Sequence, residues 1–224
     1  MTVNRSKLVS KQQRDDKGRW TTALKPKAVL IDEKGDFGRS SRSSKTMSVT
    51  AGVYSDLTGL TALVDSTPKN TKHTKDPGVL KFTTSTDDVR VDVLNALAYE
   101  DPLIRSIVVN KADIPLNVGL DTKMRDMTRD VLKDVLLEVP GEMDVIIDYR
   151  NDLKNGKGCR MTEKAAKEID RNILSCTVIR SAEYKPLQAH DFAAGAIGHE
   201  TEENDPTFHN IIREKTRVKQ YVKK

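Results

Sequence analysis

Two short apolar runs of this chain each end in a carboxylate, and this feature restricts the possible folds most. The first run is Ala28-Val29-Leu30-Ile31, followed by Asp32 and Glu33, and the second is Val145-Ile146-Ile147, followed by Asp148. A short apolar run closed by turn residues is typical of a buried strand, so each acid is expected where its strand leaves the core. On the first stretch alone a simpler interpretation is favoured, in which Asp32 starts the turn by accepting hydrogen bonds from backbone amides.

The remaining pattern predicts strands that alternate with helices. Strands are expected at 28–33, 47–54, 104–109, 143–148 and 176–179, an extended segment at 79–82, and helices at 57–64, 86–99, 121–139, 162–172 (with Thr162 as N-cap) and 186–198. In the second half this alternation indicates a parallel layer covered on both faces, whereas the first strands suit an antiparallel meander. The predicted class is α/β, with a mixed five-stranded sheet and helices on both faces.

The basic residues gather toward the two ends of the chain. We expect a basic N-terminal arm at 1–27, a domain at 28–198 with an insertion at about 56–99, and a linker with a basic C-terminal tail at 199–224. Basic arms often contact phosphate backbones, but solvated tails explain them equally well. The net charge of +5 and the pI of about 9.1 are compatible with a polyanionic partner without identifying one.

Composition excludes several classes of protein. No apolar run approaches the length of a membrane span, and the first 27 residues lack the apolar centre of a secretory signal. The two cysteines, Cys159 and Cys176, have no metal-binding spacing, which favours a reduced, cytoplasmic protein. An aromatic content of 4% argues against a platform for stacking single-stranded bases.

A third acid, Asp191, lies within a helix of otherwise small and apolar residues. Its helical neighbours are Leu187, Ala194 and Gly195, so we expect Asp191 on or beside the packed face. Three acids around one end of a sheet would repel one another without a cation, and hard divalent ions prefer such oxygen ligands. Two ions about 4 Å apart would support phosphodiester hydrolysis. The alternative is that the three acids are unrelated, and that each caps backbone N–H groups or forms a salt bridge of its own.

Two of these stretches resemble motifs of domain-of-unknown-function family 3800. Asp32-Glu33-Lys34-Gly35-Asp36 resembles the family's opening Asp-Glu-Ser-Gly signature, and residues 187–196 resemble its closing Leu-Gln-Leu-Ala-Asp-Leu-Val-Ala-Gly-Ala helix. The strand ending at Asp148 falls where the family has its middle acidic strand. Residues 78–81 are similar to its Glu-Leu-Lys segment, with the acid missing. The resemblance covers roughly residues 28–198.

The resemblance implies a ribonuclease-H-like fold with a metal site built by the first strand, a central strand and the last helix. Asp32, Asp148 and Asp191 are the implied catalytic and metal-ligating residues, for Mg²⁺ or Mn²⁺. Glu33 is an auxiliary acid that should point to the opposite face of the strand. Lys81 is an auxiliary cation for phosphate.

Several neighbouring residues depart from the family pattern or extend it. Lys34 replaces a serine and either pairs with Asp32 or holds substrate. His190 replaces a small apolar residue, and a lone histidine at such a position is more often a packed neighbour than a ligand. Arg39, Arg42 and Lys45, in a serine-rich loop, are the predicted contacts to nucleic acid. Asp126 and Asp130 are not assigned, because acids on such a helix usually face water.

These observations predict a divalent-metal-dependent nuclease or a related phosphoryl-transfer enzyme that acts on nucleic acid. The main alternative is a non-catalytic module on the same scaffold that binds nucleic acid or protein. A third is a subunit of a larger assembly, or a homo-oligomer, held through the basic arms. No membrane partner is expected.

Overall fold

The computed structural model describes residues 12–14, 20–22, 27–40, 42–69 and 78–221. Within the expected N-terminal arm, strands β1 (Gln12–Arg14) and β2 (Trp20–Thr22) pair antiparallel, with Gln13 opposite Thr21. The rest of that arm through residue 26 lies outside the described residues. Ser41, in the serine-rich loop, lies outside them as well.

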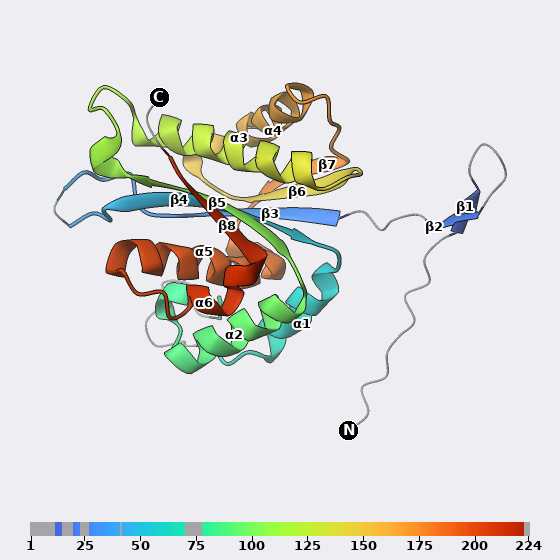
Figure 1. Cartoon of the computed structure of the whole chain (residues 1–224), viewed down its shortest axis with the longest axis horizontal. Helices are drawn as coiled ribbons and strands as arrows, with labels where there is room; N and C mark the ends of the chain where they lie inside the picture. The colour runs from blue at the N-terminus through green and yellow to red at the C-terminus, as the bar shows by residue number, and fades with distance from the viewer. Residues whose placement is uncertain (1–11, 15–19, 23–26, 41, 70–77, 222–224) are drawn as a thin grey trace.

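A six-stranded mixed sheet forms the centre of the molecule (Figure 1). Its strands are β3 (Lys27–Lys34), β4 (Thr46–Tyr54), β5 (Leu103–Asn110), β6 (Met143–Asp148), β7 (Ser175–Ile179) and β8 (Thr216–Gln220). They lie in the order β7-β6-β3-β4-β5-β8, and only β4 runs antiparallel to its neighbours. The predicted α/β class, a mixed sheet with helices on both faces, is confirmed, with a sixth strand added at one edge.

Helices cover both faces of this sheet (Figure 1). One face carries α3 (Leu120–Glu138) and α4 (Lys157–Lys167); the other carries α5 (Lys185–Glu203), α1 (Leu57–Ser66), α2 (Asp87–Tyr99) and α6 (His209–Ile212). Along β3, Val29 and Ile31 pack into the core under α3, whereas Leu30 packs into the core under α5. Because both faces are buried, the central strands are apolar at successive positions.

Two predicted elements differ from the structure. The helix expected at 162–172 is α4, Lys157–Lys167, and Thr162 is a buried interior residue whose Oγ1 donates to the Gly158 carbonyl (3.0 Å) rather than an N-cap. The left-handed Gly156 (φ 73°) starts this helix early. The segment expected to be extended at 79–82 is extended at Lys81 (φ −141°, ψ 141°), but Phe82 already belongs to the 3₁₀ turn Phe82–Thr84.

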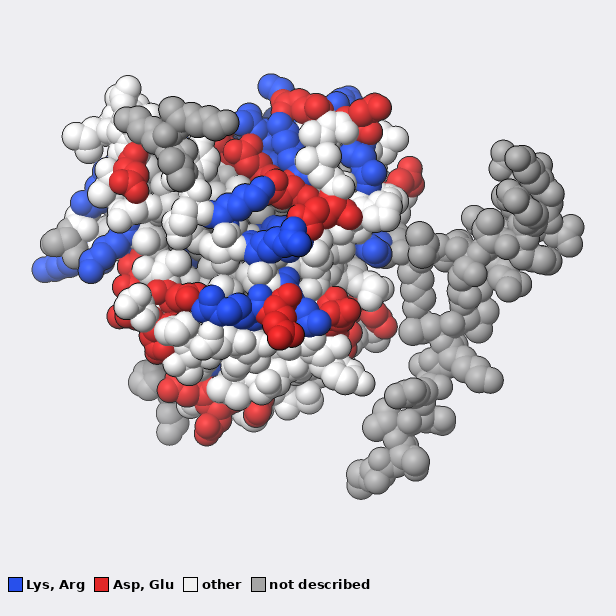
Figure 2. Space-filling model, in the orientation of Figure 1, with Lys and Arg blue, Asp and Glu red and all other residues white. Residues whose placement is uncertain are grey.

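The expected linker and tail at 199–224 is also wrong in its described part. Helix α5 continues to Glu203, and β8 joins the sheet parallel to β5. Basic residues in and just before β8 are paired with acids: Lys215 with Asp101 (2.5 Å), and Arg217 and Lys219 with Glu138 (3.8 Å) and Asp134 (2.6 Å) of α3. Figure 2 accordingly shows basic and acidic side chains intermixed across this face.

Candidate metal centre

The register of the central strands brings Asp32 and Asp148 to neighbouring positions. Strands β3 and β6 are parallel, and Ile31 lies opposite Ile147, one residue before each acid. Their in-register predecessors Leu30 and Ile146 both pack into the core under α5. Because side chains alternate along a strand, both acids face α5 at the carboxyl end of the sheet.

Asp191 comes to the same region from α5. One of its oxygens, Oδ2, accepts a hydrogen bond from the backbone N–H of Phe82 at 2.7 Å. Gly195, one helical turn later, makes this contact possible, because a Cβ atom there would lie 2.3 Å from Cγ of Phe82. The small residues of this helix therefore bring it against the 78–84 segment.

The loops at the strand ends hold the acids by backbone N–H groups. Asp148 Oδ1 accepts from Tyr149 and Ser181, both at 2.8 Å, and Asp32 Oδ1 accepts from Glu33 at 2.7 Å. Glu33 is itself a residue of β3, which continues to Lys34, so this bond is not the turn-forming role considered for Asp32. Each of these bonds uses one carboxylate oxygen, and a carboxylate can accept at both.

Gln188 links the two segments that hold Asp191 and Asp148. Its Oε1 accepts from the N–H of Leu80 and its Nε2 donates to the carbonyl of Ser181, both at 2.9 Å. Sequence reasoning did not single out this residue. A glutamine among small apolar residues of a buried helix was the available signal, because a buried amide requires partners.

Burial and mutual repulsion disfavour ionisation of these acids. Asp32 is 4% exposed, and its pKa is raised well above its usual range by burial first and then by the charges of Asp191, Glu33 and Asp148. Burial also raises the pKa of Asp148 and that of Asp191. Such a group of carboxylates favours a bound proton or a bound cation.

Glu33 belongs to the same electrostatic group. Burial raises its pKa to about 8, against the lowering effect of Arg150, whose Nε lies 3.7 Å from Glu33 Oε1. Arg150 is itself buried and binds both oxygens of Asp152, at 3.1 and 3.2 Å. Sequence reasoning missed this pair, although a charged run directly after the acidic strand was a visible signal.

Two of the predicted auxiliary residues lie near the acids. The charges of Lys34 and Lys81 both lower the pKa of Asp191, and that of Lys81 also lowers the pKa of Asp148. The stem of Lys34 packs closely on α5, because a Cβ at Gly198 would lie 2.5 Å from its Cγ. Lys34 therefore acts on Asp191, a partner that the sequence did not suggest.

His190 is placed as a packed neighbour. Its Nε2 donates to the Thr50 carbonyl (3.0 Å) and its Nδ1 accepts from the Tyr54 hydroxyl (2.9 Å), so both ring nitrogens are engaged. Burial lowers its pKa to about 4, which keeps the ring neutral. The auxiliary role assigned to His190 reduces to supporting the helix that carries Asp191.

The predicted nucleic-acid contacts differ in their surroundings. The Arg39 guanidinium donates to four backbone carbonyls between Lys111 and Val118, at 3.1 to 3.3 Å, and so fastens that loop. Arg42 and Lys45 are exposed, and their contact with nucleic acid stays a prediction. The unassigned Asp126 and Asp130 both lie beside Arg129.

The acids interact through their charges but do not converge on one point. Among the residues that the structure describes, no three His, Cys, Asp or Glu side chains are close enough together to hold a metal ion. Their donor set is nonetheless the all-oxygen set that hard divalent cations prefer.

No described helix is long and apolar enough to cross a membrane.

Comparison with known proteins gives a likeness in structure but no match in sequence. No protein-family model matches the chain, and no curated protein matches its sequence. A chain of the PCNA:RNase HII complex from Archaeoglobus fulgidus is similar in structure, with a TM-score of 0.44 and 13% sequence identity over 85% of this chain and 88% of that one.

Proposed function

We propose that this protein is a divalent-metal-dependent phosphodiester hydrolase that acts on nucleic acid. The observation that supports this most is the group formed by Asp32, Asp148 and Asp191: burial raises the pKa of each, and the charges of neighbouring acids raise the pKa of Asp32 and of Asp191 further. Buried acids that repel one another cost folding free energy, and a cation would offset that cost.

Mg²⁺ or Mn²⁺ fits the donor chemistry of the group. Asp32, Asp148 and Asp191 would hold the ion, with Glu33 as an auxiliary acid. When bound, such an ion stabilises charge on phosphoryl oxygens and lowers the pKa of a coordinated water.

The chain's own residues would orient the substrate and hold the acids. Lys34 and Lys81 lie near Asp191 and supply positive charge for a phosphate of the nucleic-acid backbone. Gln188 fixes the two backbone segments that carry the partners of Asp191 and Asp148, so it acts as a positioning residue. Arg42 and Lys45, both exposed in the loop between β3 and β4, would add contacts to the nucleic-acid backbone.

Three narrower proposals accompany this function. The order of the three acids along the fold supports membership of domain-of-unknown-function family 3800. The free thiols Cys159 and Cys176 support a cytoplasmic location. The basic arm at residues 1–27, largely outside the described residues, is proposed to contact nucleic acid or a second subunit.

The direct test is Asp148→Asn, with Asp130→Asn on the surface of α3 as a matched control. We expect Asp148→Asn to abolish Mg²⁺- or Mn²⁺-dependent cleavage of nucleic acid while leaving binding intact or stronger, because one negative charge is removed. Asp130→Asn should cleave as the wild type does. Unchanged cleavage by Asp148→Asn would refute the assigned site.

A non-catalytic binding module is the second candidate. It is favoured by the lack of a converged metal-binding group in the described part of the chain. Such a module would bind nucleic acid with a steep dependence on salt and without divalent ions, and would cleave nothing. A screen with and without Mn²⁺ separates the two functions.

A further inference from the structure

The outer face of α4 carries a row of cations that recur at intervals of three and four residues. The members of this α4 stripe, all of them exposed, are Lys157, Arg160, Lys164 and Lys167. Residues at this spacing share one face of a helix, and the buried residues of α4 occupy the other side. At 1.5 Å per residue the stripe is about 15 Å long.

Acids of the protein do not neutralise the α4 stripe. Among the residues that the structure describes, no member of the stripe forms an ion pair. Arg160 donates to the backbone carbonyl of Asn155 at 3.2 Å, which leaves its charge uncompensated. Glu163 is the one acid within α4, and Glu168, which follows the helix, is paired with Lys133 of α3. The stripe therefore has positive charge available for an external anion.

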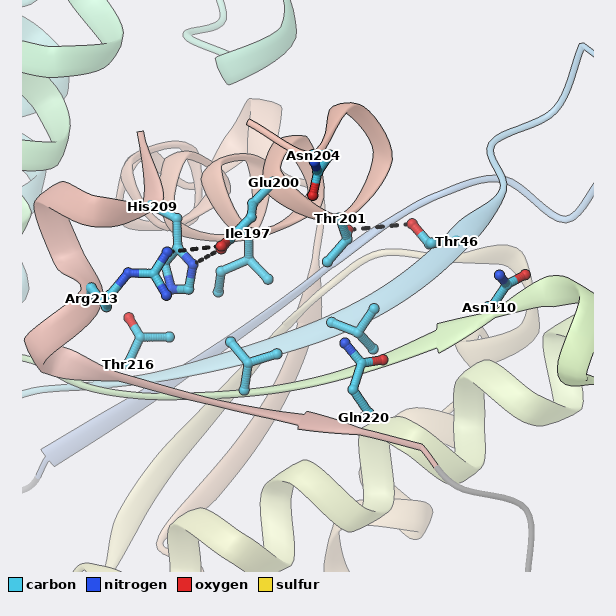
Figure 3. Close-up of a pocket in the computed structure, with 12 residues that line it drawn as sticks. Thr46, Asn110, Ile197, Glu200, Thr201, Asn204, His209, Arg213, Thr216 and Gln220 are labelled. Atoms are coloured by element: carbon cyan, nitrogen blue, oxygen red, sulfur yellow. Dashed lines mark hydrogen bonds and ion pairs between the residues drawn. The ribbon is translucent and has the colours of Figure 1, made fainter. Parts of the chain in front are cut away.

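The cations at the opposite edge of the sheet, around β8, are compensated instead. Arg213 donates to a carboxylate oxygen of Glu200 at 2.8 Å, and Figure 3 shows its side chain directed at that acid. Lys215 and Lys219 are paired with acids as well. The two edges of the sheet thus differ in how much of their positive charge is free.

The order of charges along α4 is unfavourable for the helix itself. Lys157 and Arg160 lie in its first turn, which contains no acid, and the N-cap Gly156 provides no side-chain hydrogen bond. Because the N-terminus of a helix carries partial positive charge, cations there are disfavoured and an anion is favoured. An external anion explains the placement of these two cations better than the stability of the helix does.

The α4 stripe begins at the edge of the sheet that carries the acids. A Cβ atom at Gly158 would lie 2.7 Å from Cγ2 of Val178, so the first turn of α4 packs on the carboxyl end of β7. Val178 lies opposite Ile147 of β6, the residue before Asp148. A polyanion that reaches the acids can therefore continue along the stripe.

The composition of α4 favours a duplex over a single strand. The helix has no aromatic residue on which an unpaired base could stack, and proteins hold single strands largely by such stacking. A duplex keeps its bases inside and offers phosphate, with about one charge per 1.7 Å of its axis, so about 15 Å of duplex presents roughly nine charges. A row of unpaired cations without aromatic residues matches this backbone.

We propose that the α4 stripe binds the phosphate backbone of a double-stranded nucleic acid whose scissile bond lies at the acidic group. This proposal rests on the proposed function, which supplies the identity of the polyanion. It adds the substrate class, a duplex, and the face of the molecule along which the duplex runs away from the acids.

The test is fluorescence anisotropy of the full-length protein with labelled DNA and RNA duplexes, in EDTA and over a range of salt concentrations. The stripe variant combines Arg160→Gln with Lys164→Gln, two exposed positions at which the fold should be unaffected. We expect it to bind duplex at least about tenfold more weakly, with a slope of log affinity against log salt that is shallower by roughly two, at about 0.9 for each lost phosphate contact. The matched control combines Lys215→Gln with Lys219→Gln, which remove two cations already paired with acids and should leave the slope unchanged.

Several outcomes would overturn the proposal: no saturable binding of either duplex, equal slopes in the stripe variant and the control, or tighter binding of a single strand than of the duplex. Vesicles of phosphatidylserine and phosphatidylcholine are titrated in parallel. Binding of these vesicles that depends on the stripe, without binding of duplex, would assign the stripe to a membrane and would also overturn the proposal. Because EDTA prevents metal-dependent cleavage, the result is independent of hydrolysis: a protein that never cleaves but loses duplex binding in the stripe variant would refute the hydrolase and support the stripe.

Discussion

Replacing Gly195 by alanine tests how α5 delivers Asp191 to the acidic group. The new Cβ would lie 2.3 Å from Cγ and 2.6 Å from Cβ of Phe82. Neither atom can turn away, because Phe82 is 3% exposed and packs edge-on against Phe192 and Phe208, with ring centroids 5.9 and 5.4 Å apart. The 82–84 turn must therefore move, and the Phe82 N–H must leave Asp191.

The expected size follows from opposing contributions. Overpacking a core costs about 1–3 kcal/mol, and the strained hydrogen bond to Asp191 adds about 1 kcal/mol. Alanine in place of glycine within a helix returns about 1 kcal/mol. We therefore expect Gly195→Ala to lower the free energy of unfolding by about 1–3 kcal/mol.

Gly59→Ala in α1 is the matched control for this substitution. There the nearest atom to the new Cβ is Oε1 of Glu100, at 3.0 Å, which is the free end of a flexible side chain. The helix should gain stability by about 0.5–1 kcal/mol. Urea unfolding of both variants measures the two effects, and a Gly195→Ala protein as stable as Gly59→Ala would refute the close approach of α5 to Phe82.

Three further predictions concern the surroundings of the site. Gln188→Leu leaves a backbone N–H and a carbonyl without partners, so unfolding experiments should show a loss of about 2–4 kcal/mol, and Mn²⁺ titration should show weaker binding. His190 has a folded pKa of about 4, below its usual 6.5, so the unfolded chain takes up a proton first as the pH falls. The wild type should thus lose about 3 kcal/mol of stability between pH 6.5 and 4, and His190→Gln should lack this part of the loss, whereas equal pH profiles would contradict a buried neutral ring. Arg39→Ala should lower the melting temperature and leave nucleic-acid affinity unchanged. Arg42→Ala should leave the melting temperature unchanged, weaken nucleic-acid binding and reduce its salt dependence. A loss of affinity in Arg39→Ala together with a loss of stability in Arg42→Ala would contradict these roles.

The central strands could be predicted because their sequences carry the signal locally. The runs before Asp32 and Asp148 are buried on both faces and are therefore apolar at successive positions. Strand β8 could not be predicted in this way. Its Thr-Arg-Val-Lys-Gln sequence lies at an edge with only Val218 packed on the core, and its pairing with β5 depends on residues more than 100 positions away.

The same distinction holds for the site. The strand register follows from hydrophobic pattern, so the approach of Asp148 to Asp32 was predictable. The roles of Gln188 and Arg150 depend on which loops meet them, and the composition of a helix or a turn does not contain that information. The hydrogen bonds of His190 could not be predicted either, because the partners of its ring, Thr50 and Tyr54, belong to a strand distant in sequence.

Calorimetric titration of Mn²⁺ into the wild type and into Asp32→Asn tests the central claim most directly. Removing one buried, repelling charge should leave the variant at least as stable as the wild type, so a loss of binding cannot be attributed to unfolding. We predict saturable Mn²⁺ binding by the wild type and none by Asp32→Asn. Equal binding by both proteins, or none by either, would contradict a metal centre at these acids.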